Sequence, residues 1–285
     1  MTQHSASQGS LDITIVEPRS AEEVQQGQTM LNVQWTGFLT IMRKEVIRIL
    51  RIWPQTLLPS VVTTTLYFLI FGAFIGGRLG EIDGITYIEF IVPGLIMMSI
   101  ITNAYTNVSS STFSAKFQRN IEEMLISPLN NSTIVLGFMA GGVLRGVMVG
   151  ALVMLVSTIF TPLRIYNAPL IVLTMFFTAT LLALSGFINA IYAKNYDQVA
   201  IVPTFVLTPL IYLGGVFYSI AILPPFWQQI SRLNPVLYLV NIFRYGFLGV
   251  SDVAVSTAFY FLVVFTAALW FFCLWALRRG VGLRT

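Results

Sequence analysis

Long stretches without a single charged residue constrain this chain more than any other feature. Residues 52–77, 90–115, 165–193, 198–231 and 253–277 contain no Asp, Glu, Lys or Arg, and residues 134–160 contain only Arg145. A helix that crosses the hydrocarbon core of a bilayer needs about 20 mostly apolar residues. Each stretch is long enough for one such helix, so the sequence predicts an integral membrane protein rather than a water-soluble one.

The fold class that follows is all-α, with six transmembrane helices. We place them at about residues 55–76, 90–112, 134–160, 169–192, 200–221 and 255–277. The stretch 198–231 is too long for one span, and prolines at 224, 225 and 235 bound short segments after it. Residues 223–250 are therefore predicted to form re-entrant helices that dip in from the outer face. The alternative is a belt of aromatic side chains at the outer interface.

The distribution of basic residues predicts the orientation. With both termini in the cytoplasm, the cytoplasmic segments hold eleven of the sixteen Lys and Arg residues, and the outer segments hold four. Cytoplasmic loops carry the excess of positive charge in most membrane proteins. This orientation accounts for the net charge of +4, so no nucleic-acid partner is expected. Residues 278–285 form a short basic cytoplasmic tail.

The first 54 residues divide into two parts. Residues 1–31 are polar and are predicted to be a disordered cytoplasmic tail. Residues 32–54 have apolar side chains at helical spacing, with Lys44, Arg48 and Arg51 on the opposite face. This pattern predicts an amphipathic helix that lies in the cytoplasmic headgroup layer, contacts membrane lipids and ends at Pro54. The helix either anchors the chain or relays motion.

The reactive residues are too few for most enzyme classes. The chain has one histidine and one cysteine, so a Cys/His zinc site or a nucleophile paired with histidine is not expected. No acid lies in a predicted span, where an ion-coupled carrier usually places one. No Gly-Lys pair exists, so the phosphate-binding loop of an ATPase is absent. We predict no catalytic, metal or cofactor-binding residues, and energy from ATP would come from another subunit.

A cytoplasmic docking element is therefore of interest, and residues 116–128 fit one. Phe117, Ile121, Met124 and Leu125 form one apolar stripe, Arg119, Glu122 and Glu123 point away from it, and Pro128 ends the segment. We predict a short amphipathic helix here. Its charged face is either a contact for a partner protein or simply solvated.

The segment from Arg119 to Pro128 resembles the coupling helix of type-2 ABC exporter permeases, where an acidic helix ending in Ser-Pro docks into the ATPase subunit. Phe90-Ile-Val-Pro-Gly-Leu-Ile, Asn234-Pro235 and Phe243-Arg244-Tyr245 are also similar to this family, in particular to its YadH-like bacterial inner-membrane branch. Asn120-Ile121 departs from the Gly-Thr pair of many relatives.

The resemblance implies a partner arrangement. Two copies of the chain would form a homodimer in the bacterial inner membrane, beneath which two ATPase subunits bind ATP and Mg²⁺. The docking residues would be Arg119, Glu122, Glu123, Leu125 and Pro128, and the helices near Asn234, Pro235 and Arg244 would cap the exit. The first, second and fifth spans would border the substrate route.

Polar residues follow one face of two of those spans. They are Ser99, Asn103, Thr106 and Asn107 in the second span and Thr204, Thr208 and Tyr212 in the fifth. They either line the route or make ordinary hydrogen bonds between helices. Neutral hydroxyl, amide and aromatic groups suit an amphipathic substrate, such as a lipid, a lipid-linked glycan or a hydrophobic drug.

Arg145 is the only charge inside a predicted span. A cation near mid-bilayer costs at least about 2.5 kcal/mol, so it needs a partner or access to water. Either the helix protrudes so that Arg145 reaches the cytoplasmic surface, or the guanidinium binds backbone carbonyls of a broken neighbouring helix. The glycines around it predict close helix packing.

The sequence thus predicts the permease subunit of an ATP-driven exporter that is not itself an enzyme. The alternative is a structural or regulatory membrane protein of the same shape whose partner is not an ATPase.

Overall fold

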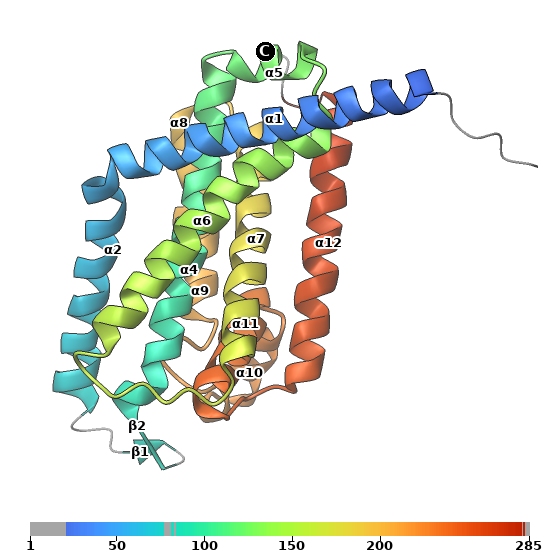
Figure 1. Cartoon of the computed structure of the whole chain (residues 1–285). Helices are drawn as coiled ribbons and strands as arrows, with labels where there is room; N and C mark the ends of the chain where they lie inside the picture. The colour runs from blue at the N-terminus through green and yellow to red at the C-terminus, as the bar shows by residue number, and fades with distance from the viewer. Residues whose placement is uncertain (1–20, 77–80, 83, 281, 283–285) are drawn as a thin grey trace, which may run out of the picture.

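The computed structural model describes residues 21–76, 81–82, 84–280 and 282, and its main feature is a bundle of long helices (Figure 1). Five of the described helices are long and apolar enough to cross a membrane. They are Trp53–Gly72, α4 (Tyr87–Phe117), α6 (Asn131–Ser157), α7 (Ala168–Tyr192) and α12 (Val255–Arg279). The first combines α2 (Trp53–Tyr67) with most of the π-helix η1 (Phe68–Ile75). The prediction of an essentially all-helical membrane protein is confirmed.

The predicted fifth span, 200–221, was wrong in its bounds. The structure has α8 (Tyr196–Val202), the π-helix η2 (Pro203–Leu207) and α9 (Thr208–Tyr212) in succession, and the helix ends nine residues early. Pro203 and Pro209 have no N–H to give, so the regular hydrogen-bond ladder is interrupted. Gly215, with φ +73°, then turns the chain. The predicted count of six spans is therefore not confirmed.

The N-terminal helix α1 (Ala21–Arg51) lies across one end of the bundle (Figure 1). It begins at Ala21, inside the region predicted to be disordered, and residues 1–20 of that predicted tail lie outside the described residues. It ends at Arg51 rather than at Pro54. Pro54 instead occupies the first turn of α2, where a missing N–H costs nothing because that N–H has no intrahelical acceptor.

Helix α4 is the centre of the bundle. Its apolar window is 83% buried, whereas that of α2 is only 17% buried. Glycines let its neighbours approach: a Cβ on Gly146 of α6 would lie 2.9 Å from Ala104 Cβ, and a Cβ on Gly186 of α7 would meet the Tyr105 carbonyl oxygen. The predicted close packing around the α6 glycines is thus present, mainly against α4.

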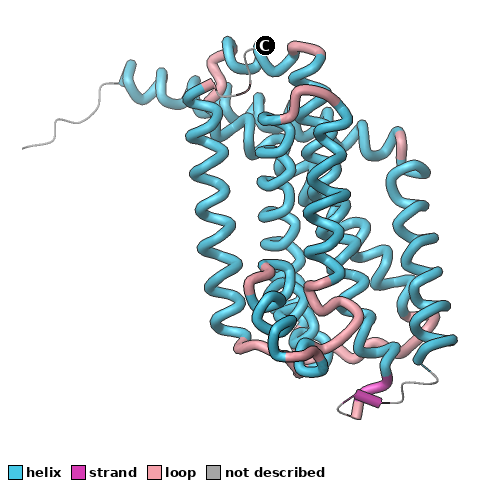
Figure 2. The backbone as a smooth tube through the Cα atoms, turned by 180° about the vertical axis from the view of Figure 1, so that it is seen from behind, coloured by secondary structure: helices cyan, strands magenta, loops and turns pink. Residues whose placement is uncertain are grey.

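Short elements cover the two ends of the bundle. Helix α5 (Asn120–Ile126) and the end of α12 lie at the same end as α1. At the opposite end lie the strands β1 (Glu81–Ile82) and β2 (Ile85–Thr86), the 3₁₀ helix η3 (Ile220–Ile222), α10 (Pro225–Arg232) and α11 (Pro235–Leu248) (Figure 2). The region 223–250 thus holds two short helices, of which α11 packs against α4, α7 and α12.

Candidate functional site

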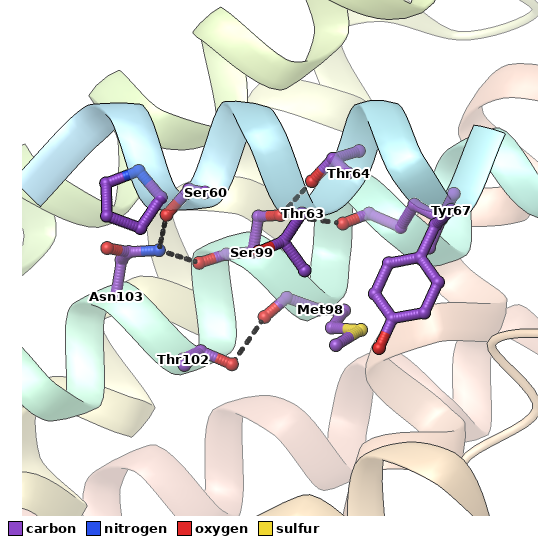
Figure 3. A pocket seen from close by; sticks show the side chains of 10 residues that line it. Ser60, Thr63, Thr64, Tyr67, Met98, Ser99, Thr102 and Asn103 are labelled. Atoms are coloured by element: carbon purple, nitrogen blue, oxygen red, sulfur yellow. Dashed lines mark hydrogen bonds between the residues drawn. The ribbon is translucent and has the colours of Figure 1, made fainter. Parts of the chain in front are cut away.

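A cavity of about 170 Å³ lies between α2 and α4 (Figure 3). Its lining alternates neutral polar and apolar side chains and carries no charge. The lining residues are Pro59, Ser60, Thr63, Thr64, Tyr67, Leu95, Met98, Ser99, Thr102 and Asn103. We call it the α2–α4 cavity.

Hydrogen bonds across the cavity join its two walls. The Asn103 side-chain amide donates to Ser60 Oγ at 3.0 Å and to the Ser99 carbonyl oxygen at 3.0 Å. The hydroxyls of Thr64 and Ser99 lie 3.4 Å apart, a weak contact. Hydroxyl groups can rotate to donate or accept a hydrogen bond. The two walls can therefore exchange the hydrogen bonds between them for hydrogen bonds to a bound molecule.

Aromatic side chains lie at one end of the α2–α4 cavity. The hydroxyls of Tyr67 and Tyr212 are 2.8 Å apart and link α2 to α9. Phe217 stacks on Tyr212, with ring centroids 5.6 Å apart, and lies 4.9 Å from the Phe71 ring. Tyr87 donates a hydrogen bond to the Phe217 carbonyl oxygen at 3.0 Å. This cluster connects the cavity to the segment that follows α9.

The predicted route residues are only partly brought together. Ser99 and Asn103 line the cavity, and Tyr212 meets it through Tyr67. Thr106 donates to the Thr102 carbonyl oxygen one turn further along α4. Thr204 and Thr208 are exposed on the η2–α9 segment, and Thr208 donates to the Pro203 carbonyl oxygen.

Asn107 is fully buried and faces α1 instead of the cavity. Sequence reasoning missed the other wall, on α2. Ser60, Thr63, Thr64 and Tyr67 recur there at helical spacing, a signal that was available in the sequence.

The segment predicted as one docking helix, 116–128, is divided in the structure. Helix α4 continues to Phe117, and Arg119 adopts a left-handed conformation with φ 62° before α5 begins. Phe117 is therefore exposed at the end of α4 instead of joining the apolar stripe, which was a wrong prediction.

The rest of the predicted stripe faces the bundle. Ile121 is fully buried in a hydrophobic core cluster, and Leu125 packs against that cluster. Glu122 and Glu123 are exposed, as is Pro128, whose carbonyl oxygen accepts a hydrogen bond from Gln34 of α1 at 2.7 Å. Helix α5 thus presents two adjacent carboxylates at the α1 end of the bundle.

A buried carboxylate, which the sequence analysis missed, joins α1 to the bundle. Glu45 has no exposed surface; it accepts hydrogen bonds from Ser111 Oγ and from Arg48 Nη2, the latter at 2.6 Å. Arg48 also donates to Asn107 Oδ1 at 2.9 Å. Gly141 makes room, because a Cβ there would lie 2.7 Å from the Glu45 Cβ. Of the charged face predicted for α1, Arg48 therefore contacts the bundle while its side chain stays 29% exposed.

Arg145 lies one turn after Gly141 and is half-buried. Among the residues that the structure describes, no acceptor reaches its buried Nε, and no carboxylate lies within 4.0 Å. Within the described part of the chain it makes none of the hydrogen bonds to backbone carbonyls that one interpretation of the sequence required.

Arg244 and Asn234 make contacts at the end of the bundle opposite to α1. Asn234 caps α11 through Val236 N and donates to the Leu210 carbonyl oxygen at 2.6 Å, and Pro235 is the first residue of α11. The Arg244 side chain is buried; it donates to the Gly215 carbonyl oxygen and lies 3.9 Å above the Phe90 ring. These three residues hold the turn after α9 against α4 and α11.

Comparison with known proteins identifies the family. Residues 36–248 match the family described as ABC-2 type transporter. The chain belongs to this family. It is 52% identical over 256 residues to the inner membrane transport permease YadH of Escherichia coli K12, an alignment that covers 90% of this chain and 100% of YadH. The likeness to the YadH-like branch inferred from the sequence is confirmed.

More distantly related proteins are also similar to this chain. Nodulation protein J of Sinorhizobium fredii is 27% identical, covering 80% of this chain and 88% of that protein. Nodulation protein J of Neorhizobium galegae is 26% identical, covering 75% of this chain and 82% of that protein. The likeness thus extends over most of the chain even at low identity.

Proposed function

We propose that this chain is the transmembrane permease subunit of an ATP-driven exporter, and that it moves an amphipathic molecule outward across the bacterial inner membrane. The observation that carries the proposal is the α2–α4 cavity, an uncharged cavity with hydroxyl, amide and apolar walls in a member of the ABC-2 type family. Such walls suit a lipid, a lipid-linked glycan or a hydrophobic drug. The chain performs no covalent chemistry in this proposal.

The proposed assembly is a homodimer with two ATPase subunits, which bind ATP and Mg²⁺. The lightly buried helix Trp53–Gly72, which combines α2 with part of η1, supports a second copy of the chain. Its exposed apolar side chains include Leu58, Val62 and Leu66 of α2 and Leu69 of η1. From the excess of basic residues we infer that the α1 end, and hence both termini, lies in the cytoplasm. The carboxylates of α5 then face the ATPase subunits.

Substitution of the cavity amide tests the route. We expect Asn103→Leu to weaken stimulation of ATPase activity by an amphipathic substrate about tenfold, because it removes a polar group that can bind the substrate and leaves Ser60 without its donor. The measurement is ATPase rate against concentration for a panel of amphiphiles, with the ATPase complex in proteoliposomes. Thr180→Val, which removes a hydroxyl bonded within α7, is the control. Equal responses of Asn103→Leu and wild type would exclude this cavity.

Charge reversal on α5 tests the docking surface. We expect the carboxylates of α5 to face basic residues of the ATPase subunit. The double change Glu122→Arg and Glu123→Arg should therefore reduce co-purification of the ATPase subunit about tenfold, since positive charges then face each other across the interface. Asp197→Arg, an exposed acid outside α5, is the matched control and should leave assembly unchanged. Undiminished assembly of the double variant would remove α5 from the docking role.

One enzymatic measurement distinguishes the exporter subunit from the alternative, a structural or regulatory membrane protein. An exporter subunit requires ATPase activity in the co-purified complex, with a rate that changes when substrate is added. ATPase activity that is indifferent to this chain would favour the alternative.

A further inference from the structure

Helices α1 and α6 run side by side in a constant register. Asn130 N donates to Gln34 Oε1 at 2.8 Å, Gly137 lies against Ile41, and Gly141 lies against Glu45. The steps between these contacts are seven and then four residues on both helices, so the contact follows one face of each. The next turn of α6 brings Arg145 into the neighbourhood of Arg48, whose positive charge acts on it unfavourably.

The charges around this contact do not balance. We call Glu45, Arg48, Asn107, Ser111 and Arg145 the Glu45 cluster. Glu45 is its acid, and each of the Glu45 carboxylate oxygens already accepts a hydrogen bond, one from Ser111 and one from Arg48. Among the described residues Arg145 has no carboxylate within 4.0 Å, so two guanidinium groups stand beside one carboxylate, which leaves one positive charge in excess. A like-charged pair beside a membrane-spanning helix is costly unless an anion or water compensates it.

The polar atoms of the Glu45 cluster that have no hydrogen-bond partner among the described residues also indicate that an anion is missing. Arg48 Nε, Asn107 Nδ2 and Arg145 Nε are buried and have no hydrogen-bond acceptor within the described part of the chain. All three atoms are donors, so the group that would complete the cluster is an acceptor. With the excess positive charge, that acceptor should be anionic.

The position of the cluster suggests where the anion comes from. The Arg48 side chain is 29% exposed and Arg145 is half-buried, so both residues are partly accessible from outside although their Nε atoms are buried. Helix α1 lies across the end of the bundle and exposes Leu39, Ile47 and Leu50. An amphipathic helix of this kind lies at the depth of the lipid headgroups.

We propose that Arg48 and Arg145 bind the phosphate of an anionic phospholipid in the leaflet that contacts α1. The phosphate supplies the missing acceptor and the missing negative charge. A zwitterionic headgroup brings its own cation, so a lipid of net negative charge is preferred. This site is separate from the α2–α4 cavity, and its occupancy does not depend on the transported substrate.

Lipid binding to the full-length chain tests the proposal. Native mass spectrometry in detergent, with added phosphatidylglycerol, gives the affinity for wild type, Arg145→Gln, Arg145→Lys and Arg43→Gln. We expect about fivefold weaker binding to Arg145→Gln, as for the loss of one cation near an anionic surface, and near-normal binding to Arg145→Lys. Arg43→Gln is the matched control, because Arg43 is an exposed cation of α1 outside the cluster.

Two outcomes would overturn the proposal. Equal affinity of Arg145→Gln and wild type for phosphatidylglycerol would exclude Arg145 from any lipid site. Displacement of the bound lipid by millimolar inorganic phosphate would assign the site to a free ion instead of to a lipid.

The wild-type chain provides a second test that needs no variant. Its thermal midpoint should be higher in nanodiscs that contain phosphatidylglycerol than in nanodiscs of phosphatidylcholine alone, because a ligand that binds only the folded state stabilises it. Identical midpoints would contradict the proposal even if Arg145→Gln failed to fold.

Discussion

Replacement of Glu45 by Gln is expected to lower the free energy of unfolding by about 3 kcal/mol. The reason is that Glu45 is fully buried and forms an ion pair with Arg48, whose Nη2 lies 2.6 Å from Glu45 Oε2. Removing one member of a buried ion pair leaves an uncompensated charge, which costs about 3–5 kcal/mol. The amide of Gln keeps the side-chain size and an acceptor for Ser111, so the effect reports the lost charge and not a cavity.

The measurement is the thermal midpoint of the purified chain in detergent, together with its yield in the membrane fraction. Glu122→Gln is the matched control, because Glu122 is an exposed acid at the same end of the bundle. We expect the control to behave as wild type. A Glu45→Gln protein with the wild-type midpoint would show that the carboxylate does not hold α1 to the bundle.

The change Gly186→Ala is expected to have a similarly large effect, a loss of about 3 kcal/mol. Helix α7 packs closely on α4 here, and an added Cβ would meet the Tyr105 carbonyl oxygen and lie 3.2 Å from Ser109 N. Both contacts are backbone atoms of the central helix, which cannot rotate away. Overpacking of this kind costs about 1–3 kcal/mol or more when the neighbours cannot relax.

Gly72→Ala is the matched control for this prediction. An added Cβ there would lie 2.6 Å from Cδ1 of Ile88, the end of a flexible side chain that can change rotamer. We expect Gly72→Ala to unfold within a few degrees of wild type and Gly186→Ala to unfold well below it, or to accumulate poorly. Equal midpoints for the two variants would contradict the packing of α7 on α4.

The charge-free stretches predicted most of the long helices because hydrocarbon excludes charge wherever the helix lies in the sequence. The predicted span 134–160 corresponds to α6, and 169–192 to α7. The prediction was wrong at 200–221, since hydrophobicity alone does not show how Pro203 and Pro209 interrupt a helix. It also missed the continuation of α4 beyond residue 112 to Phe117, a stretch that includes Lys116.

The candidate site was harder to predict, because it depends on contacts between distant segments. Glu45 reads as one more surface charge on an amphipathic helix, and its burial follows from Gly141 and Ser111, far along the chain. The role of α2 in the cavity was also missed, although Ser60, Thr63 and Thr64 recur there at helical spacing. Whether Glu122 and Glu123 contact an ATPase stays a prediction.

A density map of the complex purified with its ATPase subunit in native lipids tests the central claim most directly. We predict density for an elongated molecule in the α2–α4 cavity, in contact with Ser60, Ser99 and Asn103, and an ATPase subunit against Glu122 and Glu123. A map in which the cavity is filled by side chains while a bound molecule lies elsewhere in the membrane domain would contradict the account.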